Sequence, residues 1–197
     1  MPPKTNTQYA RAFTLVEVMI TLSIIILITV CVFGISIASQ RFFVKAESRA
    51  EILQNGRIIF ERLSREIRQA NVIVSQLPQN EIEFEDGHTP SPFAYLGADY
   101  FYIRYFTDSN LKEVHRQYKA YCFESCDVCV EYVRWNDIKI IDGEQINPQP
   151  CILEDRVVGE FVESMSFEGS GLINISLGLV KNNENIELTT QIAGRNF

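Results

Sequence analysis

The chain has 197 residues, of which 46% are hydrophobic and 22% are charged, and its formal net charge is −7 at pH 7. This composition is typical of a folded globular domain and excludes a disordered or low-complexity chain. The acidic balance also excludes a general nucleic-acid platform, because phosphate binding needs a basic surface. We therefore expect no nucleic-acid partner.

The first predicted element is a long apolar helix close to the N-terminus. Residues 18–38 are mostly apolar, and between Glu17 and Arg41 the only ionisable side chain is the thiol of Cys31. A helix of this length can cross a hydrocarbon core of about 30 Å. The sequence therefore predicts one membrane span, followed by a soluble part.

The short segment before this helix carries Lys4 and Arg11 and no acidic residue. The positive-inside bias then places the N-terminus in the cytosol and the rest of the chain outside it. One alternative is a secretory signal peptide cleaved at "SIAS", residues 36–39, although the apolar core of such peptides is shorter. The other is a plain signal anchor, in which Glu17 has no purpose, since an acid in mid-bilayer costs about 2.5 to 3.5 kcal/mol.

The order of features at the N-terminus resembles the processing segment of type IV pilins and of the pilin-like proteins of secretion and DNA-uptake systems. These features are a basic leader, Ala12, the residues "FTLVE" at 13–17 and a long apolar helix. The resemblance implies that a prepilin peptidase cuts between Ala12 and Phe13 and methylates the new amino terminus. The new amine would lie four residues before Glu17, so we expect Glu17 to pair with the amine of a neighbouring subunit during assembly. The alternatives are a pair within the same chain and an acid that snorkels to the cytosolic interface. The family usually has Gly where this chain has Ala12.

The helical pattern continues beyond the membrane segment. Residues 40–74 are predicted to extend the helix amphipathically, because apolar residues recur at three- and four-residue steps. This apolar stripe consists of Ile52, Gly56, Ile59, Phe60, Leu63, Ile67 and Ala70. We expect an unbroken helix from Phe13 to Val72 whose stripe covers one face of a sheet. Gly34 and Gly56 mark either bends or close packing.

After Pro78 the apolar period changes to two, which indicates β-strands. The predicted strands are "EIEFE" at 81–85, "DYFYIRYF" at 99–106, and two strands alternating over 173–179 and 186–192 around a "KNNEN" turn. Half-buried antiparallel strands and an amphipathic helix together predict an α+β fold. In this fold a long N-terminal helix, membrane-spanning in its first half, packs on an antiparallel β-sheet head.

Four cysteines fall in the predicted exported domain. They are Cys122, Cys126, Cys129 and Cys151, while Cys31 lies in the membrane segment. Cysteines outside the cytosol favour two disulfides, for which three connectivities are possible. A zinc site built from all four thiolates is the alternative, although the paired C-x2-C spacing occurs only once. In both cases the loop 122–151 is stapled.

No catalytic constellation stands out in the sequence. His88 and His115 are far apart, and neither belongs to a recognisable acid–base motif. Carboxylates that could gather calcium occur at Glu81, Glu83, Glu85 and Asp86. Their alternation favours a solvated strand face over a calcium site. We therefore expect no enzyme activity, no cofactor and no metal.

Within the pilin-like proteins, "QNGRIIFERLSREIRQAN" at 54–71 and "LTTQIAGRN" at 188–196 resemble the J-type minor pseudopilins of type II secretion and related large minor pilins. The resemblance implies a subunit that helps initiate or cap a filament. Its implied partners are other pilin-like subunits, the prepilin peptidase and an inner-membrane assembly platform. The implied domains are a leader (1–12), a transmembrane helix (13–39), an amphipathic extension (40–74) and a periplasmic or extracellular head (75–197). The alternative function is a binding module displayed on a pilus, active in adhesion or DNA uptake through the cysteine-rich loop.

Overall fold

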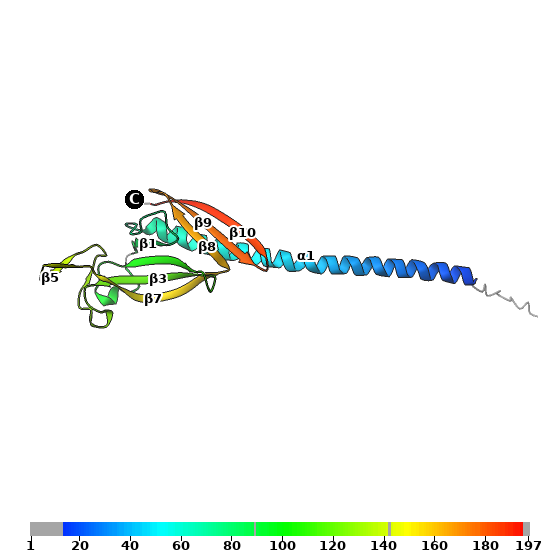
Figure 1. The fold of residues 1–197 in the computed structure, drawn as a ribbon, viewed down its shortest axis with the longest axis horizontal. Helices are drawn as coiled ribbons and strands as arrows, with labels where there is room; N and C mark the ends of the chain where they lie inside the picture. The colour runs from blue at the N-terminus through cyan, green and yellow to red at the C-terminus, as the bar shows by residue number, and fades with distance from the viewer. Residues whose placement is uncertain (1–13, 89, 142, 195–197) are drawn as a thin grey trace, which may run out of the picture. The chain divides into compact units, whose positions relative to one another are not determined.

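The computed structural model describes residues 14–88, 90–141 and 143–194. Within these residues the chain is an α+β fold with one long helix, α1 (Leu15–Gln69), and antiparallel sheets, as Figure 1 shows. The predicted fold class is confirmed. The chain divides into two units between Ala46 and Glu47, and α1 contributes to both.

The strands all belong to the second unit. The first sheet consists of β1 (Ile82–Glu85), β2 (Tyr102–Asp108), β3 (Glu113–Cys122), β4 (Tyr132–Val133) and β7 (Gln149–Glu160). The second sheet consists of β8 (Val162–Glu168), β9 (Leu172–Lys181) and β10 (Glu184–Ala193). A small hairpin pairs β5 (Lys139–Ile141) with β6 (Glu144–Ile146), and two short 3₁₀ helices are η1 (Ala94–Leu96) and η2 (Cys126–Val128).

The C-terminal part of α1 packs into the core between these elements. Every member of the predicted apolar stripe is buried except Phe60, which is half-buried. Gly56 permits a close approach, because an added Cβ would lie 2.5 Å from Leu188 Cδ1 of the second sheet. The helix continues through Gly56, so this glycine allows close packing against the sheet and does not interrupt the helix.

The helix ends at Gln69, earlier than the predicted Val72. The following residues, 71–75, instead bond to the outer edge of β1, where the Val74 N–H donates to the Glu83 carbonyl oxygen at 2.8 Å. Peptide groups that bond to a strand cannot also continue the ladder of the helix. Pairing with the sheet therefore decides where α1 stops.

The second sheet follows the predicted alternation. Ile173, Ile175 and Leu177 of β9 are buried in the core, as the period of two requires. Asn182 and Asn183 join β9 to β10 with positive φ angles of 49° and 63°. Two successive left-handed residues make the turn that matches strand twist in a tight hairpin, and asparagine tolerates this conformation well.

Strand β2 differs from the prediction, because both of its faces are covered. The period of two places Tyr102 on the face opposite Ile103, yet both side chains are fully buried. The segment 122–151 covers it: the Trp135 N–H donates to Tyr102 Oη at 3.3 Å, and the Tyr121 ring lies edge-on at 5.0 Å. Burial raises the pKa of Tyr102 to about 12, although the bond from Trp135 acts in the opposite direction.

A buried ion-pair network joins α1 to the first sheet. Glu66, 6% exposed, accepts hydrogen bonds from Tyr105 Oη at 2.7 Å and from Arg116 Nε at 3.0 Å. Arg116 also reaches Glu154 of β7, with Nη1 3.4 Å from Oε2. Burial raises the pKa of Tyr105, and the Glu66 charge raises it further. One helical carboxylate thus contacts β2 and β3 and, through Arg116, β7.

Glu83 of β1 is paired and 12% exposed, so the expected solvated face is wrong for it, whereas Glu81, just before the strand, is 40% exposed. Glu83 accepts bonds of 2.6 Å from both Lys119 Nζ and Tyr121 Oη, and Lys119 is only 4% exposed. Glu81 pairs with Arg104. These carboxylates neutralise basic residues of the neighbouring strands, which strand alternation alone does not reveal.

Candidate assembly and binding surfaces

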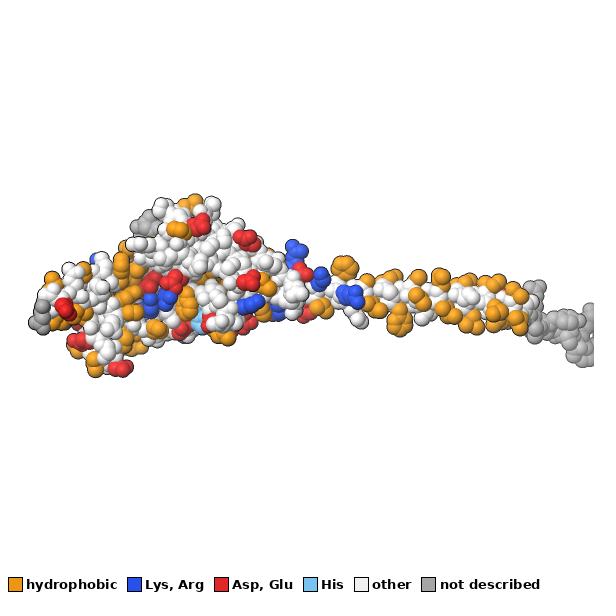
Figure 2. All heavy atoms as spheres, viewed as in Figure 1, with side chains coloured by type: hydrophobic (Ala, Val, Ile, Leu, Met, Phe, Trp, Pro, Cys, Tyr) orange, Lys and Arg blue, Asp and Glu red, His pale blue; other side chains and the backbone are white. Residues whose placement is uncertain are grey.

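The first unit presents an apolar helical surface. All residues from Thr14 to Ala38 are exposed, and the helix contains a window with a mean hydropathy of 2.9. Apolar side chains cover the visible face of this segment in Figure 2. Its length and composition suffice for one membrane crossing.

Three hydroxyl groups within this apolar stretch are satisfied by the helix itself. Each bonds to a backbone carbonyl three or four residues earlier, at 2.7 to 2.9 Å. The three donors are Thr21, Ser23 and Thr29. Such internal bonds leave these side chains without need of water, as an apolar environment requires.

Glu17 is the one acidic residue of this stretch. Its carboxylate is exposed and makes no hydrogen bond or ion pair with any residue that the structure describes. Its backbone N–H donates to Thr14 Oγ1 at 3.3 Å, so Thr14 caps the start of α1. The spacing Thr-x-x-Glu is that of a capping box, a signal the sequence analysis missed. Ala12 and Phe13, the predicted cleavage and methylation residues, lie outside the described residues.

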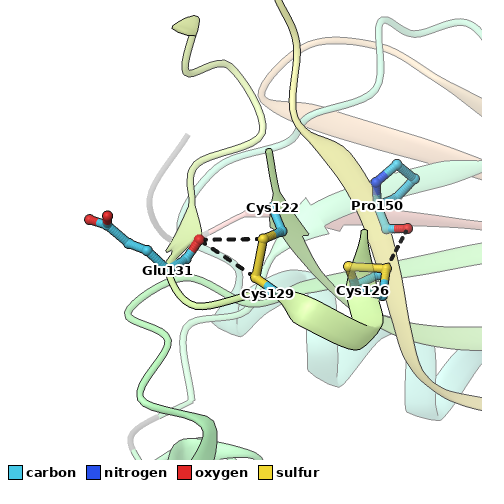
Figure 3. The surroundings of a disulfide bond; sticks show 6 residues. Cys122, Cys126, Cys129, Glu131 and Pro150 are labelled. Carbon is cyan, nitrogen blue, oxygen red and sulfur yellow. Dashed lines mark hydrogen bonds between the residues drawn. A yellow bond between two sulfur atoms is a disulfide. The ribbon is translucent and has the colours of Figure 1, made fainter. Parts of the chain in front are cut away.

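The four cysteines of the head come together in two disulfides. Cys122 pairs with Cys129 and Cys126 pairs with Cys151, with Cα–Cα distances of 6.1 and 5.4 Å. Figure 3 shows the Cys122–Cys129 bridge beside the carbonyl of Glu131, whose oxygen lies 3.5 Å from the Cys122 sulfur, and Cys126 beside the carbonyl of Pro150. The predicted pair of disulfides is confirmed, and the zinc alternative is wrong, because a bonded sulfur is no longer a thiolate ligand.

The segment 122–151, which we name the stapled lobe, exposes apolar side chains. Val130 is 89% exposed, Ile140 68% and Val128 60%. Around them stand more acidic than basic exposed residues. The acids are Glu124, Asp127, Glu131, Asp137 and Glu144, and the bases are Arg134 and Lys139. An apolar surface with an acidic rim is typical of a protein-binding site and unsuited to nucleic acid.

The two histidines lie in separate places, each beside a carboxylate. His88 Nδ1 is 2.5 Å from Asp86 Oδ1, and His115 Nδ1 is 2.9 Å from Asp155 Oδ1. Burial raises the pKa of Asp155, but hydrogen bonds from Gln117 and His115 outweigh it and hold that pKa below its usual range. Among the described residues, no three His, Cys, Asp or Glu side chains are grouped to hold a metal ion.

The structure leaves Glu17 on the first unit and gathers the predicted cysteines in the stapled lobe of the second. Comparisons with protein-family models, with curated proteins and with solved structures each found no match. The case for a function therefore comes from the residues of these two surfaces.

Proposed function

We propose that the chain is a minor pilin or pseudopilin that helps initiate or cap a type IV pilus-like filament or a type II secretion pseudopilus. A prepilin peptidase cleaves it after Ala12, and the mature protein begins at Phe13. Residues 13–39 hold it in the cytoplasmic membrane, with the N-terminus facing the cytosol and the head in the periplasm or outside the cell. Its partners are other pilin-like subunits and the inner-membrane assembly platform. Its role is structural, without catalysis or a cofactor.

The observation that carries this proposal is the carboxylate of Glu17, which has no partner among the described residues, at the start of an exposed apolar helix. The surrounding hydroxyls are already bonded to the backbone, and no basic side chain occurs between Glu17 and Arg41. An ionisable residue in such a place needs a partner from outside the helix. In a pilin-like protein, a neighbouring subunit of the filament can provide this partner.

The partner group is the terminal amine that cleavage creates on Phe13. Within one chain this amine is four residues, or about 6 Å of helix rise, from Glu17. A neighbouring subunit displaced by about one turn presents its amine to Glu17 with better geometry. In an apolar layer this pair is stronger than in water, and it also offsets the desolvation of both charges. Glu17 thus sets the register of a subunit that enters the filament.

The burial of the apolar stripe within the head also supports an assembly role for the membrane segment. Because α1 uses that stripe on its own sheets, the contacts between subunits fall to the membrane segment and its flank. The flank carries Arg41, Lys45 and Arg49 at four-residue steps directly after the apolar stretch. Four-residue steps place these basic side chains along one side of the helix.

Substitution of Glu17 in the native host tests the proposal. The Glu17→Val chain should be cleaved after Ala12 and inserted into the membrane, yet should not co-purify with the other pilin-like subunits. Glu17→Gln should fail in the same way, because glutamine keeps the size and polarity of the side chain but cannot neutralise an amine. Mass spectrometry of the mature N-terminus and cross-linking in membranes are the measurements.

The glutamine variant separates the charge of this side chain from its size and polarity. Normal assembly of Glu17→Gln combined with a defect in Glu17→Val would show that a polar side chain suffices here and refute the charge pair. Thr14→Val, which removes the observed cap but keeps the carboxylate, is the matched control and should assemble. A mature chain beginning at Met1 or after Ser39 would refute the processing itself.

The exposed apolar residues of the stapled lobe favour a second candidate, a binding module displayed on a pilus. Two disulfides hold Val128, Val130 and Ile140 in solvent, an arrangement that a folded head does not need for its own core. Val130→Ser with Ile140→Ser should then abolish adhesion while filaments form normally. Equal loss of filaments and adhesion would instead assign the lobe to assembly.

A further inference from the structure

A groove runs between the exposed side of α1 and strand β10, wholly within the second unit. Its volume is about 1230 Å³, and its walls include Leu53, Arg57 and the half-buried Phe60 from the helix, with Leu188 and Thr189 from the strand. A second hollow of about 480 Å³ continues along the helix and shares Glu61 and Ser64 with the first. The proposed assembly role makes no use of this surface.

Strand β10 exposes an unpaired backbone edge to this groove. It is the outer strand of the second sheet, and within the described part of the chain β9 is its only strand partner (Figure 1). Glu184 flanks the two-residue turn and pairs with Lys181, so alternate residues from Glu184 onward bond to β9. The intervening residues direct both backbone groups outward. These are Asn185, Glu187, Thr189, Gln191 and Ala193, and none has a backbone hydrogen-bond partner among the described residues.

The other long edges of the sheets are covered or irregular. Residues 71–75 bond along the outer side of β1, and the pairing of Gln79 with Phe167 covers part of β8. Strand β7 carries two register shifts against β3. By contrast, β10 is paired over ten residues without any shift, from Glu184 to Ala193. Proteins usually blunt a flat edge because another strand can add to it, so an open regular edge beside a groove favours such an addition.

The helical wall of the groove is basic in an otherwise acidic protein. Arg57, Arg65 and Arg68 line the two hollows, against the single acid Glu61. No carboxylate of the described residues lies within 4.0 Å of these three guanidinium groups, while the chain as a whole has a net charge of −7. The charge of the groove therefore complements an acidic occupant. Glu187 does not oppose this, because its side chain alternates with Leu188 and faces solvent on the other side of the sheet.

We propose that β10 and the adjoining face of α1 form a docking site for an extended acidic segment of a partner protein. The segment adds to the second sheet as a further strand, bonding to the outward groups of β10. Its helix-facing side chains alternate, with apolar ones against Leu53 and Phe60 and carboxylates against the arginines. Arg57 and Arg65 are about 12 Å apart along the helix axis, which matches carboxylates four residues apart on a strand, about 13 Å.

A synthetic strand tests the site on the full-length chain in detergent micelles. The probe is a fluorescein-labelled ten-residue peptide with Val and Glu on one face, two of the Glu four residues apart, and Thr on the other. Fluorescence anisotropy should show saturable binding with a Kd at or below about 100 μM. The same peptide with N-methyl groups on the amides facing β10 should bind at least about tenfold more weakly, since it keeps the side chains but cannot pair. A peptide with Lys for Glu should also lose at least about tenfold.

Variants of the protein address each wall of the groove separately. Thr189→Pro removes an outward N–H that makes no bond to β9, so the native ladder stays intact while peptide binding falls by about tenfold. Arg57→Glu should weaken binding of the acidic peptide about tenfold. Arg49→Glu is the matched control: it changes the same charge on an exposed residue of α1 outside the groove and should leave the Kd unchanged.

Several results would overturn the proposed docking site. Absence of binding up to about 1 mM, equal binding of the N-methylated peptide, or equal effects of Arg49→Glu and Arg57→Glu would each overturn the proposal. A wild-type dimer in sedimentation that Thr189→Pro dissolves would also overturn it, because a second copy would then occupy the edge. Glu17→Val should bind the peptide normally, so that failure of this site and failure of the assembly proposal are distinguishable.

Discussion

At the scale of single residues, Glu66 is the buried carboxylate through which α1 bonds to the first sheet. It lies on the buried side of the helix and receives bonds from Tyr105 and Arg116, while Arg62 Nε stands 3.7 Å away. Breaking a buried pair by removing one partner costs more than the pair contributes, because the other charge stays buried. Glu66 is therefore important mainly as the counter-charge of Arg116.

Glu66→Leu should lower the free energy of unfolding by about 3 kcal/mol, because Arg116 keeps only its longer contact with Glu154. Thermal unfolding of the full chain in detergent, followed by circular dichroism, measures this loss. Adding Arg116→Met should recover most of it, since the double variant removes the deeply buried charge, while Arg62, which also loses Glu66, is one-third exposed to water. Glu61→Leu on the exposed side of the helix is the control and should change stability by less than about 0.5 kcal/mol. A Glu66→Leu protein as stable as the control would show that the network adds nothing.

At the scale of elements, the stapled lobe depends on covalent closure. Its strands are short: β5 and β6 pair only with each other, and β4 contacts β3 through two residue pairs. A two-stranded hairpin alone is marginally stable in water. The lobe is anchored to the first sheet by its disulfides, since Cys122 ends β3 and Cys151 belongs to β7.

The two bridges should contribute unequally to stability. Cys126–Cys151 spans 25 residues and Cys122–Cys129 spans 7, so loop-closure entropy predicts about 3.5 and about 2.4 kcal/mol respectively. Paired Cys→Ser variants should lose stability in that order. Trp135, the only tryptophan of the chain, lies in the lobe and reports its unfolding by fluorescence. The reverse order would mean that residual structure or native strain, and not loop length, sets the contribution of each bridge.

At the scale of the whole molecule, the two units demand different surroundings. The first exposes an apolar helix with the free Cys31, and the second contains two disulfides that persist only in an oxidising compartment. A chain that crosses the membrane once meets both demands if its head is exported. The basic residues Lys4 and Arg11 before the helix agree with this orientation.

Thiol counting in membranes tests this orientation. Protein extracted without reductant should react with alkylating agent at Cys31 alone after denaturation, out of the five cysteines of the chain. Reversing the leader charges with Lys4→Glu and Arg11→Glu should retain part of the protein with its head in the cytosol, where all five thiols stay reduced. One reactive thiol in both proteins would contradict the role of the leader charges, and five in the wild type would contradict export.

Much of the fold follows from local patterns in the sequence. The apolar run, the helical stripe and the period-two strands each need only neighbouring residues, because side-chain direction along one element is set by backbone geometry. The presence of four cysteines after the predicted membrane span likewise predicted two disulfides. The position of Glu17 marked the residue on which the proposed function depends, since an acid among apolar residues is visible without any fold.

The tertiary structure decided whatever depends on which distant segments meet. The end of α1 is set by the pairing of residues 71–75 with β1, and the burial of Tyr102 by the stapled lobe lying over β2. The choice among three disulfide connectivities, the bonds of Glu66 and the open edge of β10 also depend on strand order and register. A sequence pattern specifies the two faces of an element, but the partner on each face is selected by the packing of the whole chain, so these features become visible only in three dimensions.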